Sequence, residues 1–282
     1  MESSPAFLNG EYLPLDECRV SVLDRGFIFG DGIYELITVY KNNAFYLAQH
    51  LERLQRSMDE VKITSPYSDD EWEILVNNLV QQSEHDDLAI YIQVTRGIAP
   101  RDHFFPNSTQ ATVFAMANPL PLVSSKYLKN GVELITTNDI RWQRCDIKTI
   151  SLLANVLAKD EAAEASATEA IMVRDGYALE GSASNLFLVR DDVVYTHPKD
   201  NLILPGITRD FVLELLNELG MEFKEQFIPK DWLYSADELW VASSTKEVLA
   251  ATKIDGKVVA DGRPGKHWRQ TYDLYQQRKM SI

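Results

Sequence analysis

The first hydrophobic residues of the chain lie on either side of an Asn-Gly pair, and this pattern predicts a β-hairpin. The apolar triplet that begins at Ala6 precedes Asn9-Gly10, and Glu11-Tyr12-Leu13 follows it. Asn-Gly is favoured in two-residue hairpin turns because both positions tolerate positive φ. The three glycines of residues 24–32 then predict an irregular loop, and the β-rich residues 33–40 predict a strand.

Beyond residue 46 the hydrophobic residues recur at the spacing of helices. Leu51, Leu54 and Met58 predict a helix over about 47–61. The sequence Ser-Asp-Asp-Glu at residues 68–71 is a capping-box pattern, which predicts the start of a second helix. Strands are expected again at 89–95 and 111–117.

Two prolines and two serines interrupt the periodic pattern at residues 118–125. Because such residues break helices and strands, we expect a linker at 119–126 between an N-terminal domain, 1–118, and a C-terminal domain, 127–282. In the second domain, strands are expected at 131–137, 170–173, 185–189 and 193–196, helices at 151–167 and 208–219, and a closing hairpin at Asp255-Gly256. The predicted class is α+β in two domains.

The composition is that of a globular protein and narrows the choice of partners. The chain is 45% hydrophobic and 25% charged, and its apolar runs are too short to span a bilayer. The start has no basic and apolar segments of the secretory kind, and two cysteines form no disulfide framework, so a cytoplasmic protein is expected. The net charge of −14 disfavours nucleic acid and membrane surfaces as partners.

Lys148 is a candidate for Schiff-base chemistry. It lies between Ile147 and Thr149, shortly after two arginines and before a predicted helix. A free lysine has a pKa of about 10.4, and burial or nearby positive charge lowers it toward the value that a nucleophilic amine needs. A lysine in this position is more often structural than catalytic, so the residue needs support from other motifs.

Other motifs supply groups that would suit a phosphorylated, nitrogen-containing cofactor. Glu180 precedes the small residues of 181–184 at a junction of two strands, where a carboxylate could pair with a protonated ring nitrogen. Gly206-Ile207-Thr208 opens a predicted helix with Thr208 as its expected N-cap, which is an arrangement that binds phosphate. Ser243 and Ser244 place hydroxyls after the strand 239–242. Each motif is common by itself.

A loop between two prolines, residues 100–106, contains Arg101 and His103 together with two phenylalanines. The prolines stiffen the loop, and an arginine can hold a carboxylate with two parallel hydrogen bonds. An ordinary rigid surface loop would have the same composition, so this motif alone leaves both interpretations open.

Taken in order, these motifs resemble the fold-type IV pyridoxal-phosphate enzymes, and most of all the D-amino acid aminotransferases. The resemblance extends from Phe7 to about Asp261. The stretches that carry it are Asp24–Tyr40, Gln93–His103, Asp139–Leu153, Glu180–Asn185 and Gly206–Asp210. It implies a small α+β N-terminal domain and a larger C-terminal domain with a barrel-like β-sheet.

The resemblance also implies a role for each candidate residue. Lys148 matches the lysine that forms the Schiff base and carries a proton, and Glu180 matches the partner of the pyridine nitrogen. The phosphate-binding positions of the family correspond to Arg53, Ile207, Thr208, Ser244 and, as a weaker match, Ser243. Leu204 matches an apolar contact of the cofactor ring. Tyr34, Arg101 and His103 match the residues that hold the substrate α-carboxylate.

By this resemblance the expected reaction is transfer of an amino group from a D-amino acid, such as D-alanine or D-glutamate, to a 2-oxo acid by a ping-pong mechanism. The cofactor implied is pyridoxal 5'-phosphate, with no metal. A homodimer is also implied, because the family's arginine and histidine reach the site from the neighbouring subunit. One departure is Ala183, where a serine is usual, so one hydroxyl is missing.

Several alternatives share the fold or the lysine. Branched-chain L-aminotransferases, R-selective amine transaminases and aminodeoxychorismate lyases have the same lysine and glutamate at the positions that Lys148 and Glu180 match. The pair Arg101 and His103 favours a D-amino acid, because it suits a fixed carboxylate. A non-catalytic binding protein and a Schiff-base lyase without a cofactor are the alternatives from other classes, and both would be colourless.

Overall fold

A computed structural model describes residues 4–280. The first three residues, part of the start inspected for a leader segment, lie outside this range. The chain forms two compact units: residues 4–121 with Ile147–Ser151, and Leu122–Asp146 with residues 152–280. The domain boundaries expected near 119–126 stay a prediction. In the described part of the chain, no helix has the length and hydrophobicity needed to cross a bilayer.

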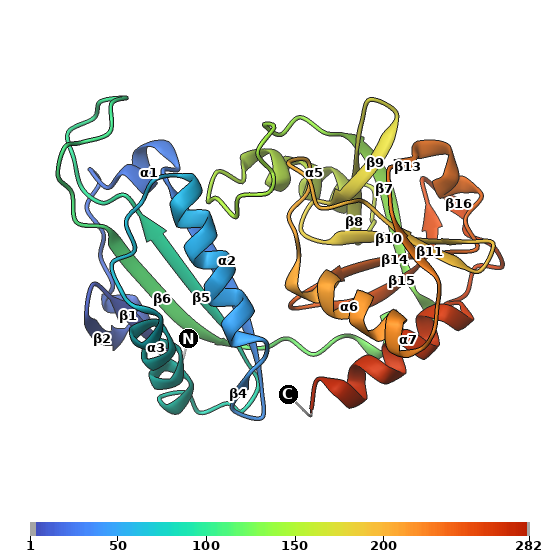
Figure 1. The fold of residues 1–282 in the computed structure, drawn as a ribbon, viewed down its shortest axis with the longest axis horizontal. Helices are drawn as coiled ribbons and strands as arrows, with labels where there is room; N and C mark the ends of the chain where they lie inside the picture. Colours follow the sequence, from blue (N-terminus) through green and yellow to red (C-terminus); the bar gives the residue numbers. More distant parts are fainter. Residues whose placement is uncertain (1–3, 281–282) are drawn as a thin grey trace. The chain divides into compact units, whose positions relative to one another are not determined.

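The first unit is a six-stranded antiparallel sheet in the order β2-β1-β6-β5-β3-β4. Its strands are β1 (Pro5–Leu8), β2 (Glu11–Pro14), β3 (Gly32–Tyr40), β4 (Asn43–Ala44), β5 (Leu88–Thr95) and β6 (Thr112–Pro119). Its helices are α1 (Arg25–Phe29), α2 (Leu47–Glu60) and α3 (Asp69–Gln81), with the 3-10 turn η1 (Leu15–Glu17). Helix α2 packs on β3, and α3 packs on β1, β5 and β6, so both cover one face of the sheet (Figure 1).

The core of the first unit lies between this face and the two helices. Ile33, Ile37 and Ile90 of the strands contact the buried faces of α2 and α3, which include Leu54 and Leu79. Burial of such side chains is worth about 1.5–3 kcal/mol each.

Local sequence signals in the first unit are confirmed. Asn9 and Gly10 have φ of 51° and 103°, as the hairpin turn between β1 and β2 requires. The Ser68 side chain accepts from Glu71 N–H, and the Glu71 carboxylate accepts in return from Ser68 N–H, which completes the capping box of α3. The expectation of a wholly irregular loop at 24–32 is wrong, because Asp24 caps the short helix α1 by accepting from Gly26 N–H.

The second unit is built around a closed ring of six strands, β10-β14-β15-β7-β8-β9, in which β9 pairs back to β10 through Glu180 and Asn185. Its strands are β7 (Val132–Asn138), β8 (Glu169–Arg174), β9 (Tyr177–Gly181), β10 (Asn185–Arg190), β11 (Val193–Thr196), β12 (Phe223–Glu225), β13 (Ile228–Pro229), β14 (Glu238–Ser243), β15 (Glu247–Ile254) and β16 (Lys257–Val258). The barrel-like sheet expected from the family resemblance is therefore confirmed.

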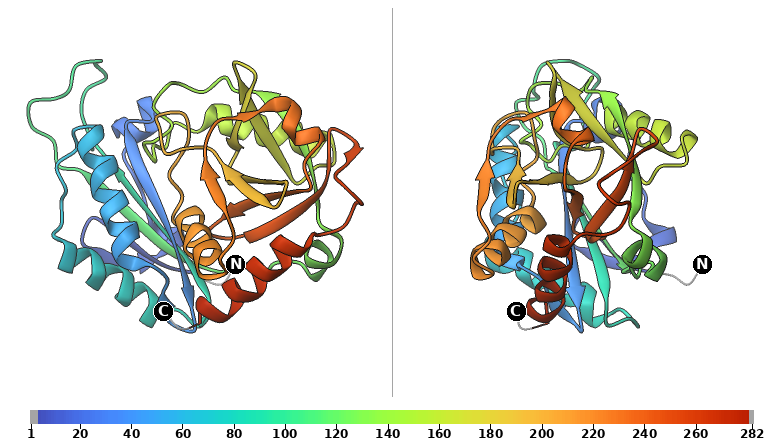
Figure 2. Two further views of the ribbon diagram at one scale, coloured as in Figure 1. Left: turned by 45° about the vertical axis from the view of Figure 1, so that its right-hand side comes forward. Right: turned by 90° about the vertical axis from the view of Figure 1, so that its right-hand side faces the viewer.

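Alternate residues of the ring point to opposite sides. Leu186 pairs with Val241 and contributes to one apolar cluster, whereas the next pair, Phe187 and Trp240, points away from it. The helices of this unit are α4 (Ser125–Asn130), α5 (Leu153–Glu164), α6 (Ile207–Glu218) and α7 (Lys266–Arg278), with the 3-10 turn η2 (Lys230–Tyr234). Helices α6 and α7 lie side by side against β14, and α5 packs on β8 (Figure 2).

Two helices of the second unit differ from the expectation. The helix expected over 151–167 spans only Leu153–Glu164, because the Ser151 hydroxyl donates to the Gly30 carbonyl oxygen at 3.1 Å and belongs to the preceding extended segment. Helix α7 was not expected at all, although Trp268, Tyr272 and Tyr275 follow helical spacing on its buried face. The closing hairpin at Asp255-Gly256 is confirmed between β15 and β16.

Candidate active site

Lys148 lies in the short segment Ile147–Ser151, which packs against the start of β3 in the first unit. The Tyr34 N–H donates to the Lys148 carbonyl oxygen at 2.9 Å, and Thr149 pairs with Ile33 as an isolated β-bridge. The Lys148 Nζ lies 4.0 Å from the centroid of the Tyr34 ring. The structure therefore brings together Lys148 and Tyr34, two of the residues predicted from the sequence.

Arg53 is buried under the sheet rather than exposed on the surface of α2. Its Nε and Nη2 donate to the two carboxylate oxygens of Glu35 at 2.9 Å and 2.7 Å. His50 Nδ1 lies 3.1 Å from Glu35 Oε1, and all three side chains are at most 6% exposed. One turn beyond Arg53, the Ser57 hydroxyl accepts from the Lys148 N–H at 3.4 Å.

The charges of this network fix its protonation. Burial raises the pKa of Glu35, but Arg53 and His50 outweigh burial and hold that pKa well below its usual range. Burial also lowers the pKa of His50 against the attraction of Glu35. The network thus contains a permanently charged carboxylate and arginine beside the Lys148 segment.

Arg101 and His103 are exposed, and both lie against one aromatic ring. The Arg101 Cζ is 5.4 Å from the centroid of Phe29, and the His103 ring is 5.5 Å from it. Phe29 is the last residue of α1. The structure therefore places these two predicted residues against the same ring, and their contact with Phe29 was not predicted from the sequence.

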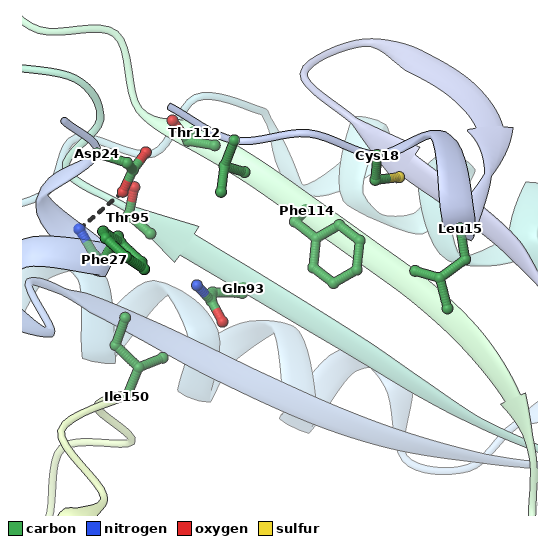
Figure 3. A pocket seen from close by; sticks show the side chains of 11 residues that line it. Leu15, Cys18, Asp24, Phe27, Gln93, Thr95, Thr112, Phe114 and Ile150 are labelled. Carbon is green, nitrogen blue, oxygen red and sulfur yellow. Dashed lines mark hydrogen bonds between the residues drawn. The ribbon is translucent and has the colours of Figure 1, made fainter. Parts of the chain in front are cut away.

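A cavity of about 580 Å³ lies in the first unit, between residues of α1, β5 and β6 (Figure 3). Its lining includes Gln93, Phe114, Phe27 and Ile150, but none of the predicted site residues. Gln93 Oε1 accepts from the Tyr91 hydroxyl at 2.7 Å, and the Tyr91 ring stacks on Tyr34 at 5.7 Å. Burial raises the pKa of Tyr91 to about 12, so this hydroxyl stays a hydrogen-bond donor.

In the second unit, Glu180 is 4% exposed and accepts hydrogen bonds from three residues. Arg141 Nη1 donates at 2.5 Å, Asn185 Nδ2 at 3.0 Å and the Leu204 N–H at 3.1 Å. Burial raises the pKa of Glu180 to about 7, although Arg141 and Leu204 oppose that shift. A positive charge brought to Glu180 would pull its pKa back down, as the predicted pairing with a ring nitrogen requires.

The sequence interpretation missed Arg141 and Asp139 as parts of this site. Arg141 donates from Nε and Nη2 to the two oxygens of Asp139, at 2.9 Å and 3.0 Å, and reaches Glu180 with its remaining nitrogen. The attraction of Glu180 and Asp139 raises the pKa of Arg141 despite its burial. An Asp-x-Arg spacing followed by Lys148 was visible, but nothing local linked it to Glu180.

A short segment connects Glu180 to the start of α6. Leu204, bound to Glu180 through its N–H, also accepts from Asn185 Nδ2 at 2.8 Å through its carbonyl oxygen. The N-cap of α6 is Gly206, so the expectation that Thr208 caps the helix is wrong; Thr208 lies within the first turn and is buried. A Cβ on Gly206 would come within 2.1 Å of Asn185 Oδ1, so only glycine allows this close approach.

This arrangement fits the groups of pyridoxal phosphate. The N-cap Gly206 forms no side-chain cap, and the first-turn N–H groups of Ile207 and Thr208 form a helix start of the kind that binds phosphate. Ser243 is the last residue of β14, and its neighbour Ala242 pairs with Asn185, which in turn pairs with Glu180. Ser243 and Ser244 therefore lie at the end of a strand that is separated from Glu180 by β10. Residues 204–207 connect Leu204, whose N–H binds Glu180, to the N-terminus of α6.

The serines that follow Glu180 turn inward, toward a second buried carboxylate. Ser182 and Ser184 both donate their hydroxyls to Glu169, which is 1% exposed. Ala183 between them is exposed. The missing serine hydroxyl therefore lies outside the network around Glu169.

Comparison with known proteins identifies the class. The sequence profile of the family described as Amino-transferase class IV matches residues 32–254. The chain belongs to this family of pyridoxal-phosphate enzymes. Among solved structures, a branched-chain amino acid aminotransferase of Escherichia coli has a TM-score of 0.93 at 25% identity, covering 98% of this chain and 94% of that one.

Other relatives are nearer in sequence. The chain is similar to a D-alanine aminotransferase of Bacillus licheniformis, at 43% identity over 91% of this chain and 90% of that protein. It is also similar to one of Staphylococcus aureus (strain COL), at 42% identity over 96% of each. A T.th. branched-chain amino acid aminotransferase solved with pyridoxamine 5'-phosphate is 26% identical, with a TM-score of 0.93 and coverage of 99% and 95%.

Proposed function

We propose that the protein transfers the amino group of a D-amino acid, such as D-alanine or D-glutamate, to a 2-oxo acid such as 2-oxoglutarate or pyruvate. The observation that carries this proposal is the likeness to D-alanine aminotransferases at 42–43% identity over at least nine-tenths of the chain. Arg101 and His103, which both lie against the Phe29 ring, support it as a pair that can bind a carboxylate. We call this pair of residues the carboxylate grip.

Each candidate residue has a separate role in this proposal. Bound pyridoxal phosphate supplies a cationic ring that withdraws electrons from the substrate Cα. Lys148 Nζ holds the cofactor and moves the proton of that carbon, while Glu180 keeps a proton on the ring nitrogen. Thr208, Ser244 and Arg53, with Ile207 and Ser243, hold the phosphate. Leu204 packs on the ring, and Tyr34 joins Arg101 and His103 at the substrate carboxylate.

The assembly proposed is a homodimer that works in the cytoplasm. Large apolar side chains are exposed on both units, including Phe27 at 71% and Phe104 at 82% in the first and Leu153 at 72% in the second. Such side chains favour a protein interface. Two free cysteines, Cys18 and Cys145, are compatible with a reducing compartment. Sedimentation at micromolar concentration should give a particle of two chains, and a monomer would refute the assembly.

A transamination screen tests the function. Purified protein supplied with pyridoxal phosphate should be yellow, and borohydride should bleach it and label Lys148. Paired D- and L-amino acids are then offered with 2-oxoglutarate or pyruvate, and we expect turnover of D-alanine in two separable half-reactions. Turnover confined to branched-chain L-amino acids would favour the alternative suggested by the 25–26% identical structures. A protein that stays colourless would refute both.

The substrate grip has a test of its own. Arg101→Ala should lower kcat/KM for D-alanine by about 30-fold or more, because loss of a charged partner from a bound carboxylate costs about 2–5 kcal/mol. Arg19→Ala serves as the control, since Arg19 donates only to the loop carbonyl oxygens of Asp16 and Cys18 in the residues described here. Equal D-alanine turnover in both variants would remove the carboxylate role of Arg101.

A further inference from the structure

The glycine-containing segment 24–32 has no assigned part in the proposed chemistry, yet it contacts the loop that presents Arg101 and His103. Helix α1 begins after the cap Asp24 and ends at Phe29, where Gly30 adopts φ of 65°. This left-handed residue turns the chain sharply into Asp31. Two side chains of the segment contact the loop, Arg25 and Phe29, and Asp31 binds Arg25 and Arg96.

Arg25 binds the backbone of the loop directly. It is 4% exposed, and its Nη1 donates to the Asp102 carbonyl oxygen at 2.7 Å and to that of Phe104 at 3.4 Å. Asp102 lies between Arg101 and His103, so this arginine fixes the peptide between the two residues of the grip. Its Nε donates to Asp31 at 2.7 Å.

Arg96 supports the other end of the loop. It forms a two-pronged contact with Asp31, at 2.8 Å and 2.9 Å, and donates to the carbonyl oxygens of Val61 and Lys62 at 2.6 Å and 2.8 Å. Its guanidinium lies 3.8 Å from the centroid of the Phe105 ring. Asp31 is thus shared by two arginines, which hold its pKa below the usual range although burial raises it.

Phe29 is the side-chain contact common to both residues of the grip. Its ring lies 5.4 Å from Arg101 Cζ and 5.5 Å from the His103 ring, and on the same ring Arg25 Cζ lies 4.8 Å from the centroid. Within one chain Arg101 and His103 are exposed, and Phe29 is the ring that both of them contact in the described residues. An aromatic ring under a guanidinium favours one orientation of it.

We propose that Arg25, Asp31 and Arg96 are positioning residues for the carboxylate grip, and that Phe29 orients Arg101 and His103 and thereby sets affinity for the substrate carboxylate. This inference rests on the proposed function. Its physical basis is pre-organisation: a grip that is already ordered avoids the conformational entropy that a mobile loop would lose when it binds. In the described residues, the hydrogen bonds and ring contacts of the Arg25, Phe29 and Arg96 side chains are made with Asp31, with residues 61–62 and with the loop, and not with Lys148 or Glu180. The chemical step should therefore be affected less than binding.

Steady-state kinetics of the holoenzyme test the proposal with Phe29→Leu and Arg25→Lys. For both variants we expect the KM for D-alanine and for 2-oxoglutarate to rise about tenfold, and kcat to change less than threefold. Arg19→Lys is the control, because this exposed arginine also donates to two backbone carbonyl oxygens but to none of the loop 100–106, and its KM should stay within twofold. The visible spectrum and melting temperature report whether each variant folds and binds cofactor.

A substrate without the carboxylate charge separates positioning from general damage. D-alaninamide has the same Cα and methyl group as D-alanine, so its reaction, followed by cofactor absorbance, should be equal in wild type and Phe29→Leu. The D-alanine to D-alaninamide ratio should therefore fall about tenfold. An unchanged ratio, or an unchanged KM in folded Phe29→Leu, overturns the proposal, even where Arg25→Lys fails to fold.

The same measurements keep this inference apart from the proposed function. If wild-type protein does not act on D-alanine, the function itself is wrong. If wild type is active and Arg101→Ala is impaired while Phe29→Leu and Arg25→Lys keep normal KM values, the function stands and only the positioning role fails.

Discussion

Glu35 and Glu180 are both buried glutamates bound to an arginine, one in each unit of the molecule, yet their pKa values move in opposite directions. Glu35 is 0% exposed, and Arg53 and His50 hold its pKa well below the usual range. Glu180 is 4% exposed, and burial raises its pKa to about 7. Both carboxylates are almost completely buried, so the difference comes from the charged and hydrogen-bonding groups around each of them.

Arg53 gives both prongs of its guanidinium to Glu35, whereas Arg141 gives both prongs to Asp139 and only one N–H to Glu180. Asp139 also adds a second negative charge near Glu180, which raises its pKa further. Two-pronged contacts are the stronger kind. The negative charge of Glu35 is therefore balanced by groups of the protein itself, while Glu180 can still bind a positively charged group of a ligand.

The largest loss of stability is expected from removal of Arg141. Arg141→Met leaves Glu180 without its cation and Asp139 with Arg174 alone, at 3.0 Å. Loss of one partner from a buried pair costs about 3–5 kcal/mol, so we expect a fall of about 4 kcal/mol in the free energy of unfolding, measured by urea titration. Arg144→Met, in an ion pair whose arginine is 41% exposed, should cost less than about 1 kcal/mol. Equal losses would contradict the comparison.

Neutralisation of Glu35 tests the other carboxylate through its pH dependence. Because its pKa is lower in the folded than in the unfolded protein, ionised Glu35 stabilises the fold above pH of about 4.3, and this stabilisation disappears as the pH falls through the folded pKa. Glu35→Gln should therefore lose about 3 kcal/mol at pH 7 and progressively less below pH of about 4.

The measurement for Glu35 is urea unfolding at several pH values between neutral and acid. Glu133→Gln is the control, because Glu133 pairs with Lys253 on the surface, and should change stability by less than about 1 kcal/mol. A stability difference for Glu35→Gln that stays constant with pH would refute the assignment of Glu35 as an ionised carboxylate paired with Arg53.

The structural features that could be predicted from the sequence alone depend on contacts between residues close together in the chain. The hairpin at Asn9-Gly10 and the capping box at Ser68 were predictable because their hydrogen bonds join residues at most three positions apart. The class, the barrel and the cofactor were predictable through family resemblance, which collects many weak local signals. Helix α7 was overlooked because its polar composition hid the spacing of three buried aromatic residues.

The charged contacts were not predictable in the same way. Arg141 and Glu180 are 39 positions apart and meet only because β9 and the segment after β7 come together in the second unit. Likewise, Arg53 lies on the inner face of α2, where an arginine is stable only because Glu35 faces it from β3. Pairing across elements depends on tertiary structure, and no periodicity in one element encodes it.

Replacement of Glu180 should have a smaller energetic effect, seen in catalysis rather than folding. Glu180→Gln keeps the size of the side chain but removes its negative charge, so it cannot hold a proton on a ring nitrogen, and kcat for D-alanine should fall about 100-fold, or about 2.7 kcal/mol of barrier. The visible spectrum should show that cofactor remains bound. If kcat stays within threefold of wild type, Glu180 has no electrostatic role.

The smallest effect is expected at Ala183. This residue is exposed, while its neighbours Ser182 and Ser184 bind Glu169. Ala183→Ser should therefore leave kcat/KM within about twofold, since a single new neutral hydrogen bond is worth at most about 1.5 kcal/mol. A gain of tenfold or more in D-alanine turnover would show that the missing hydroxyl matters to the reaction.

The order of strands in the barrel has a consequence for biosynthesis. The hairpin Glu180–Asn185 can form as soon as both residues leave the ribosome, but the ring closes only when β15, which ends at Ile254, pairs in parallel with β7 some 120 residues earlier in the chain. A nascent chain that stops before β15 exposes the unpaired edges of β7 and β14, which invite association with other chains. Premature termination in this interval should therefore yield aggregated protein rather than a smaller folded one.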